Sequence, residues 1–234
     1  IDMADNSVAT IIDEFKMQMN SYAMLFNYHL LNLCIKAEPV SLLSIAVEID
    51  DAVMNLEEVS SLGLVDEYQF AITPEENSYV FPICKALKME HPEFEIDQKL
   101  EKSQFSDEMD TIIYVKMPEV NEDRHEACID YIDFRYEAAV TKSDALYAES
   151  AVKATKAMQG AELKYIEAAN EKLKEIYDWY KDFVDNLKAD KLKEVEEGYQ
   201  KYLSELEAQD AAKAEESASY GKDAMFSMKM NDDE

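Results

Sequence analysis

The side chains that most often do chemistry in proteins are sparse and scattered in this sequence. The three histidines, His29, His91 and His125, are far apart, and none has cysteines or carboxylates at the spacing that holds a metal ion. There is no glycine-rich phosphate loop, no nucleophile elbow and no zinc-binding helix motif. We therefore expect no catalytic residue, no metal site and no cofactor, and the sequence favours a protein that is not an enzyme.

Acidic side chains dominate the 234 residues. Asp and Glu number 51 against 23 Lys and Arg, which gives a net charge of −28. A field of that sign repels phosphate backbones and anionic lipid surfaces, so direct binding to nucleic acid is not favoured. The simplest interpretation is a solvated acidic surface, and the alternative is a surface that binds a basic partner protein.

Aromatic residues are concentrated in one helical stretch near the middle of the second half. Tyr177, Trp179, Tyr180 and Phe183 fit the packed core of a helical bundle, but Tyr177 and Trp179 cannot both share the stripe of the other two with full burial. One of them is expected to point outward. Because exposed aromatic rings are frequent anchors of protein interfaces, these four residues are the predicted partner-binding site. The hypothesis places them at a hairpin tip, Trp179 to Leu187, that inserts into a partner protein.

The three cysteines, Cys34, Cys84 and Cys128, are odd in number and form no CxxC pair. A disulfide framework is therefore not expected, and a reducing compartment fits best. No run of about 18 apolar residues is present, so no transmembrane helix is predicted.

The first element that the pattern predicts is a helix from about Ser7 to Ile35. Proline cannot continue a helix, so Glu38-Pro39 ends it. Apolar residues recur at three- and four-residue spacings along one face of this helix. They are Val8, Ile12, Phe15, Met19, Tyr22, Phe26 and Leu33.

The period then changes between Ser41 and Lys116. Apolar residues alternate with others in Ile45–Ile49, Tyr68–Ile72 and Ile113–Val115, which predicts half-buried strands. Phe81–Met89 is typical of a short helix. The polar stretch from Glu95 to Asp110 is predicted to be a loop.

The remainder is predicted to be helical from an N-cap at Asn121. A heptad repeat runs from Ile166 to Leu187, breaks near Lys188–Asp190 and restarts from Leu192 to Leu206. Two runs joined by a polar break indicate an antiparallel helical hairpin, and a single bent helix is the alternative. At Gly160 the helix either continues or bends.

Together these elements predict an α+β fold, a three-helix bundle with a helical hairpin arm and an inserted small β-rich domain. The predicted bundle comprises residues 1–37 and 119–210, the inserted α/β domain residues 38–118, and a flexible acidic tail residues 211–234.

The order of these elements resembles the ribosome recycling factor family, and local motifs support the likeness. Glu38-Pro39-Val40-Ser41-Leu42-Leu43 is similar to the exit of that family's first helix, and Ser60–Asp66 to its second strand. The stretch from Phe70 to Leu87 is similar to its third strand and small helix. Ile113–Pro118 and Asn121–Arg124 resemble its last strand, proline hinge and second-half helix start. The resemblance covers roughly residues 8–145, with a looser match at 190–210.

The resemblance implies a basic surface that binds ribosomal RNA, and here this sequence departs from the family. Arg124 and Arg135 are the only arginines. Asp144 and Tyr147 stand about where arginines are expected. Since each phosphate contact adds to affinity, their loss is expected to weaken RNA binding by orders of magnitude. The degenerate RNA-binding region is Lys36, Arg124, Arg135 and Lys142.

Two functional hypotheses follow from the resemblance and its departures. In the first, a recycling-factor relative is repurposed as a structural or adaptor subunit that acts through protein contacts within a larger complex, with basic partners. In the second, the protein is an organellar ribosome recycling factor that splits post-termination ribosomes with a translocase elongation factor. The resemblance also implies a location in a plastid or mitochondrion.

Overall fold

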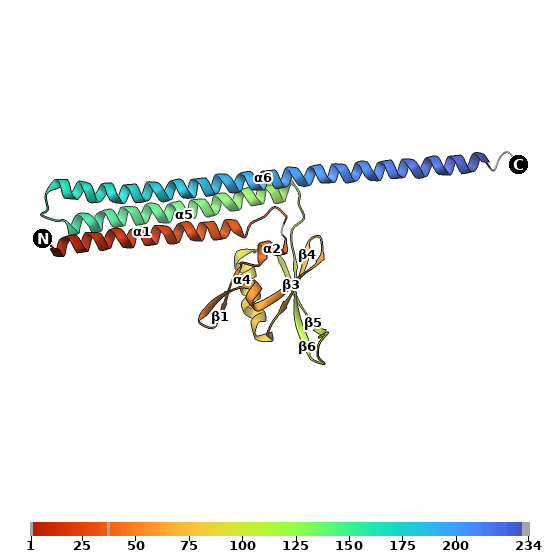
Figure 1. The fold of residues 1–234 in the computed structure, drawn as a ribbon, viewed down its shortest axis with the longest axis horizontal. Helices are drawn as coiled ribbons and strands as arrows, with labels where there is room; N and C mark the ends of the chain where they lie inside the picture. Colours follow the sequence, from red (N-terminus) through yellow and green to blue (C-terminus); the bar gives the residue numbers. More distant parts are fainter. Residues whose placement is uncertain (1, 37, 231–234) are drawn as a thin grey trace. The chain divides into compact units, whose positions relative to one another are not determined.

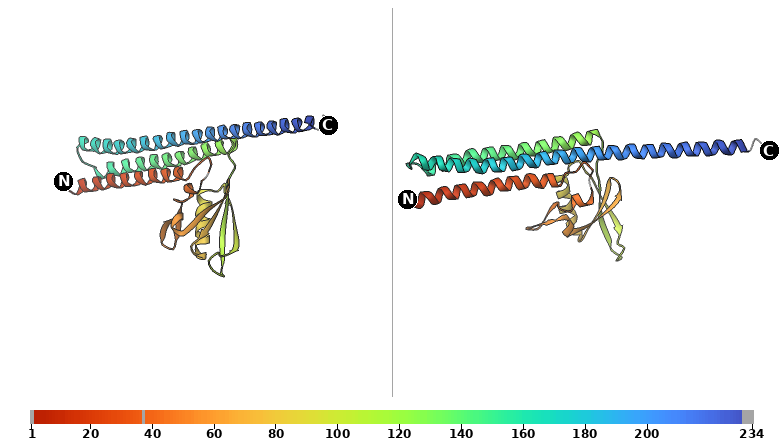
Figure 2. Two further views of the ribbon diagram at one scale, coloured as in Figure 1. Left: turned by 45° about the vertical axis from the view of Figure 1, so that its right-hand side comes forward. Right: turned by 45° about the horizontal axis from the view of Figure 1, so that its top comes forward.

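The computed structural model describes residues 2–36 and 38–230, and the chain forms two compact units that divide between Val195 and Glu196. The first unit holds three helices that lie side by side and a small α/β part that is inserted between the first two of them (Figure 1, Figure 2). This arrangement confirms the predicted α+β fold class. The bounds predicted for bundle and insert stay predictions, because the division into units does not separate these two parts.

The bundle is built from α1 (Asp2–Leu31), α5 (Glu122–Ala157) and the first part of α6 (Leu163–Met230). The stripe predicted along the first helix is largely its buried face. Phe15 approaches Tyr147 of α5 with 6.1 Å between ring centroids, and Phe26 approaches Tyr136 of α5 at 6.2 Å. The fully or nearly fully buried α1 residues are Val8, Phe15, Met19, Ala23, Phe26 and Leu30.

The N-cap predicted for the second bundle helix is confirmed. Asn121 lies in extended backbone, and its Oδ1 accepts a hydrogen bond from the backbone N–H of Arg124 at 2.8 Å. Glu122 and Asp123 occupy the first turn, where carboxylates favour the positive end of the helix dipole.

The turn of the helical hairpin lies at Gly160 and not at Lys188–Asp190, so the predicted position of the hairpin is wrong. Helix α5 ends at Ala157, and α6 begins at Leu163. Gly160 has φ +88°, a conformation that residues with a Cβ rarely adopt. Helix α6 continues through Lys188–Asp190 because this break in the heptad has no glycine or proline, and Lys188 forms an ion pair with Asp133 of α5 at 2.9 Å.

The insert contains two antiparallel sheets, a β1–β2 hairpin and a four-stranded sheet in the order β3-β4-β6-β5. The predicted strands near Ile45, Phe70 and Ile113 and the predicted short helix are present. The bounds are α2 (Pro39–Leu42), β1 (Ala46–Ile49), β2 (Ala52–Asn55), α3 (Leu56–Val59), β3 (Ser60–Asp66), β4 (Gln69–Pro74), the 3-10 turn η1 (Asn77–Tyr79), α4 (Val80–Glu90), β5 (Glu95–Lys102) and β6 (Met109–Lys116).

The loop predicted for Glu95–Asp110 is wrong, because Glu95–Lys102 forms β5. This strand lies at the edge of the sheet and pairs only with β6. Charged side chains are common on edge strands, where they oppose pairing with other chains. The alternation of apolar residues that identified the other strands is therefore weak here, and Ile96 is the only residue of β5 that is not exposed.

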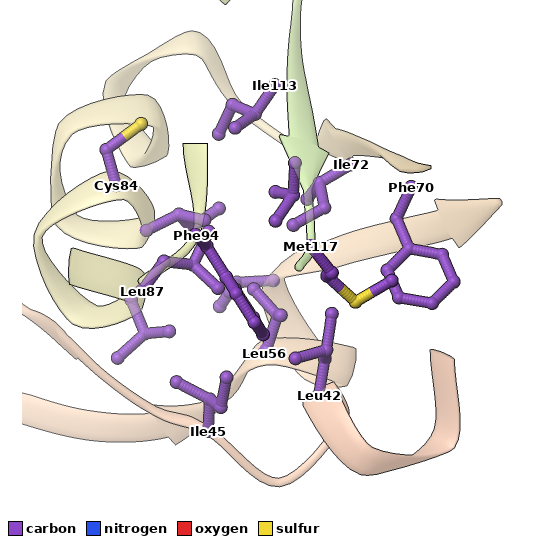
Figure 3. Close-up of a cluster of buried hydrophobic side chains, with 14 residues drawn as sticks. Leu42, Ile45, Leu56, Phe70, Ile72, Cys84, Leu87, Phe94, Ile113 and Met117 are labelled. Carbon is purple, nitrogen blue, oxygen red and sulfur yellow. The ribbon is translucent and has the colours of Figure 1, made fainter. Parts of the chain in front are cut away.

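The core of the insert is a cluster of apolar side chains between the sheet and α4. Figure 3 shows that side chains from α2, α3 and α4 converge on those of the strands. Burial of this cluster raises the pKa of the Cys84 thiol above its usual value. The fully buried members are Leu42, Ile45, Val47, Leu56, Phe70, Ile72, Ile83, Leu87, Ile113 and Val115.

The second unit comprises the C-terminal part of α6. Residues 211–230, predicted to be a flexible acidic tail, are helical up to Met230, and residues 231–234 lie outside the described residues. Alanine, glutamate and lysine are good helix formers, which explains a helix without a buried face. Every side chain that the structure describes between Ser204 and Phe226 is exposed.

Candidate functional site

Arg124 is the first residue of the predicted RNA-binding region, and the structure places it inside the molecule. Only 7% of the residue is exposed. Its Nη2 donates to the carbonyl oxygen of Cys34 at 2.9 Å, its Nε donates to that of Ile35 at 3.4 Å, and its Nη1 lies 3.6 Å from Glu93 Oε1. The guanidinium therefore joins the exit of α1, the start of α5 and the insert, and it is not available to a phosphate.

The other three cations of this region are held in different places. Lys36 forms an ion pair with Glu67 at 2.6 Å. Arg135 lies over the ring of Tyr131 on α5, with 5.1 Å between its Cζ and the ring centroid. Lys142, which is exposed, lies 5.9 Å from the ring centroid of Tyr22 on α1.

The structure thus brings only Arg135 and Lys142 together, on a shallow groove of about 40 Å³ between α1 and α5. Lys36 and Arg124 lie near the exit of α1, where Arg124 is buried and Lys36 is paired. A surface that binds phosphates through several arginines needs exposed guanidinium groups. These contacts do not build such a surface.

A buried carboxylate joins the insert to two bundle helices. Glu90, the last residue of α4, is 6% exposed. It accepts a hydrogen bond from the hydroxyl of Tyr131 on α5 at 3.1 Å, and its Oε1 lies 3.0 Å from Nδ1 of His29 on α1. Burial and the nearby Glu90 charge raise the pKa of Tyr131 far above its usual value, so its hydroxyl is a donor.

A second polar cluster lies directly after α4. His91 is buried, stacks on Phe94 with 4.2 Å between ring centroids, and lies 3.1 Å from Oε1 of Glu93. Burial raises the pKa of the Glu93 carboxyl, but the hydrogen bond and charge of His91 together with Arg124 hold that pKa below its usual value. Glu93 therefore acts as an anion that links His91 to Arg124.

The predicted aromatic site divides into an outward and an inward part. Trp179 is the outward member, with 60% of its surface exposed. Its ring stacks on Phe183 with 5.7 Å between centroids and meets Tyr180 edge-on at 4.7 Å. The exposed indole therefore packs against the next residue and against the residue one turn further along α6.

Tyr177 and Tyr180 face the neighbouring helices. The Tyr177 hydroxyl donates to Asp144 of α5, and burial together with this bond raises the pKa of Tyr177 to about 12. The Tyr180 hydroxyl donates to Oδ1 of Asn20 on α1 at 3.4 Å. A groove of about 350 Å³ lies beside Trp179, lined by Lys16, Lys172, Glu175, Ile176, Trp179 and Tyr180.

The aromatic residues do not lie at the tip of a hairpin, which corrects that part of the hypothesis. The hairpin turn is at Gly160, and Trp179 lies sixteen residues into α6, roughly 24 Å along the helix from its first residue. The polar break that suggested a tip is an uninterrupted part of the helix. Trp179 therefore borders a groove on the flank of the bundle.

Sequence reasoning missed the two polar clusters at the junction. His29 and Glu90 are separated by 61 positions in the chain, and no spacing rule connects them. The one available signal was the placement of Glu90-His91 at the end of a short amphipathic helix. Within residues 2–36 and 38–230, no group of three or more His, Cys, Asp or Glu is placed to hold a metal ion. Among the helices that the structure describes, none has the length and hydropathy needed to cross a membrane.

A helical bundle with an α/β insert after its first helix defines a two-part α+β class of protein. Comparison with known protein families identifies this class. The sequence model described as "Ribosome recycling factor" matches residues 30–216. This match covers most of the chain, including the whole insert, so the chain belongs to the ribosome recycling factor family.

A solved structure agrees in fold. A solution structure of a ribosome recycling factor superimposes with a TM-score of 0.55 and 18% identity, over 82% of this chain and 98% of that chain. The T. thermophilus ribosome recycling factor, in models with E. coli elongation factor G on the E. coli post-termination complex, gives a TM-score of 0.45 and 16% identity over 81% of this chain and 98% of that chain. No curated protein matches this sequence.

Proposed function

We propose that this protein is a ribosome recycling factor: it binds post-termination ribosomes and separates their subunits together with a translocase elongation factor. The observation that carries this proposal is the family match over residues 30–216, which covers the insert, α5 and the part of α6 up to residue 216. The contacts of Arg124 with Cys34, Ile35 and Glu93 support it, because they hold the insert against the helices.

The proposed mode of ribosome binding differs from phosphate recognition by arginine. Arg124 is buried, Arg135 lies over an aromatic ring, and the net charge is −28. A protein with these properties gains little binding free energy from contacts with RNA backbones and more from contacts with basic proteins. We infer that its contacts are made largely with basic ribosomal proteins and that its role is not catalytic. We place it, as a further part of the proposal, in an organelle, a plastid or mitochondrion.

A second candidate function is favoured because Lys36, Arg124 and Arg135 of the predicted RNA-binding region form contacts within the protein itself. If no ribosome contact survives the loss of exposed arginines, the same fold serves as an adaptor subunit within another large assembly. The proposed partner-binding site then comprises the groove beside Trp179 and the predicted residues Tyr177, Trp179, Tyr180 and Phe183, because an exposed indole is a strong anchor for protein interfaces.

Co-sedimentation tests the proposal. The full chain is mixed with ribosomes from its own source and, separately, with ribosomal RNA freed of protein. We expect the chain to pellet with the ribosomes and to leave the free RNA unbound. Pelleting with free RNA would contradict the proposed binding mode. Absence from both, with migration in another large complex, would contradict ribosome binding and favour the adaptor role.

A further inference from the structure

The four-stranded sheet of the insert has two edge strands of different character. Its strand order is β3-β4-β6-β5, so β3 and β5 each pair with a neighbouring strand on one side only. Edge strands that stay unpaired usually carry charged side chains, and β5 does so at five of its eight positions. Strand β3 has no charged residue before Asp66, its last position. The edge at β5 is therefore protected against pairing with another chain, and the edge at β3 is not.

The pairing of β3 with β4 indicates which backbone groups of β3 face outward. In an antiparallel pair, opposite residues alternate between those that exchange hydrogen bonds and those that do not. Just before β3, the N–H of Glu75 donates to the carbonyl oxygen of Val59 at 2.9 Å, and this pair is in register with the two strands. Hydrogen-bonded positions therefore recur at every second residue, at Ser61 and Gly63. The residues between them direct their backbone groups away from β4.

Leu62 and Leu64 thus offer two N–H and two C=O groups to a further strand. Outside the pairing of β3 with β4, none of the described residues forms a hydrogen bond with the main chain of either leucine. Leu64 is 63% exposed, and no atom lies within 4 Å of a Cβ added at Gly63. The register becomes irregular after Leu64, which ends the regular strand there. We call Ser61–Leu64 the open edge.

Carboxylates lie at both ends of the open edge. Glu57 and Glu58 precede it on α3, Asp66 and Glu67 follow it, and all four are exposed. Lys36 pairs with Glu67, so the negative charge is greatest at the α3 end. A second copy of β3, added antiparallel, would bring like charges together at both ends, which opposes a homodimer through this edge. A strand that carries basic residues at its ends is favoured instead.

We propose that the open edge binds an extended segment of another protein, which adds to the sheet antiparallel to β3 and carries lysine or arginine on both sides of an apolar centre. Backbone hydrogen bonds to Leu62 and Leu64 supply affinity. Leu62 packs against the core of the insert, and Leu64 lies on the same face of the sheet, so two apolar side chains of the segment pack beside these leucines. A slip of one residue would turn those side chains to the other face, so the alternation fixes the register.

A synthetic peptide, Lys-Lys-Val-Thr-Val-Lys-Lys, tests the proposal in a nuclear magnetic resonance titration of the full chain. We expect saturable binding that slows hydrogen exchange at the amides of Leu62 and Leu64. Methylation of the backbone nitrogens of both valines removes the donors that face β3, and it should weaken binding at least about tenfold. Methylation of the threonine nitrogen, which faces solvent, should change affinity by less than about twofold. Absence of binding, or equal weakening by the two methylations, would overturn the proposal.

Two matched variants test the position of the site. Leu64→Lys places a cation beside the basic peptide and removes an apolar contact, and it should weaken binding at least about tenfold. Leu100→Lys changes a leucine of the opposite edge that is 68% exposed, and it should bind like the wild-type chain. Full affinity in Leu64→Lys would overturn the assigned site.

The charge of the partner and the alternative of a second copy have their own tests. Replacing the four lysines of the peptide by glutamate should abolish binding, and unchanged affinity would overturn the basic character of the partner. Sedimentation velocity of the chain alone should show no dimer that Leu64→Lys abolishes, because such a dimer would make a second copy the occupant. The proposal does not rest on ribosome recycling, since peptide binding and subunit separation are measured separately.

Discussion

The guanidinium of Arg124 donates a hydrogen bond to the main-chain carbonyl oxygen of Cys34 at 2.9 Å, across 90 positions of the sequence. One of the two arginines in the chain is thereby committed to the contact between the exit of α1 and the start of α5. A residue that could have bound phosphate instead stabilises the fold. This use of Arg124 connects the architecture of the family to the binding mode proposed here.

Replacing this arginine should destabilise the protein strongly. Arg124→Ala leaves the Cys34 carbonyl without its donor and removes the guanidinium beside Glu93, and we expect a loss of about 3 kcal/mol in the free energy of unfolding. Urea unfolding followed by circular dichroism measures this loss. Lys142→Ala removes an exposed cation and should change stability by less than about 0.5 kcal/mol. Equal effects of the two substitutions would show that Arg124 is not a structural residue.

Stability should depend on pH through Glu93. The usual pKa of this carboxyl is 4.5, and His91 and Arg124 hold the folded-state pKa below that value. The ionised carboxylate therefore stabilises the folded state at pH values above the unfolded-state pKa, and this contribution is lost as the pH falls through the folded-state pKa. Glu93→Gln should lower stability at neutral pH and flatten the decline below about pH 4.5.

Urea unfolding at a series of pH values between about 3 and 7 checks this prediction. Glu162→Gln is the matched control, because Glu162 belongs to an exposed pair with Lys164. A decline in stability with the same slope in Glu93→Gln and in the wild-type chain would contradict the role assigned to Glu93.

Gly160 and Gly221 should respond to alanine with opposite signs. Gly160 has φ +88° in the hairpin turn, and no atom lies within 4 Å of the position of an added Cβ, so Gly160→Ala costs about 1 kcal/mol through the backbone alone. Gly221 lies within helix α6, where alanine is favoured by about 1 kcal/mol. Calorimetry should show a lower melting temperature for Gly160→Ala, and circular dichroism a higher helix content for Gly221→Ala. Tolerance of alanine at position 160 would contradict the placement of the turn.

The single tryptophan offers a direct test of the aromatic site. Because Trp179 is 60% exposed, its fluorescence should be that of a hydrated indole and should be quenched readily by acrylamide. Trp179→Ala should change stability by less than about 0.5 kcal/mol, whereas Tyr180→Ala, at a buried position, should cost about 3 kcal/mol. A protected, blue-shifted emission would mean that the indole is covered.

Some parts of the fold follow directly from local patterns. The heptad of α6, the alternation near Phe70 and Ile113, and the N-cap at Asn121 each depend on neighbouring residues, and the structure has each of them where the pattern placed it. Strand β5 escaped notice because an edge strand carries charges on most of its positions. The hairpin turn lies at Gly160 because glycine adopts the positive φ that the turn needs, whereas a break in a heptad without glycine or proline does not interrupt a helix.

The junction could not be predicted by the same means. The contacts of Glu90 with His29 and Tyr131 join three elements that only the tertiary fold brings together. The burial of Arg124 likewise depends on carbonyl groups 90 positions away. The sequence indicated which cations were present, and only the structure indicated which of them face solvent.

The central claim is that this chain recycles ribosomes, and subunit separation tests it most directly. Post-termination ribosomes from the protein's own source are incubated with the chain, the matching translocase elongation factor and GTP, and sucrose gradients then measure the fraction of separated subunits. The account predicts separation that requires both proteins and that persists in Arg135→Ala and Lys142→Ala variants. Intact ribosomes in the presence of both proteins would contradict it.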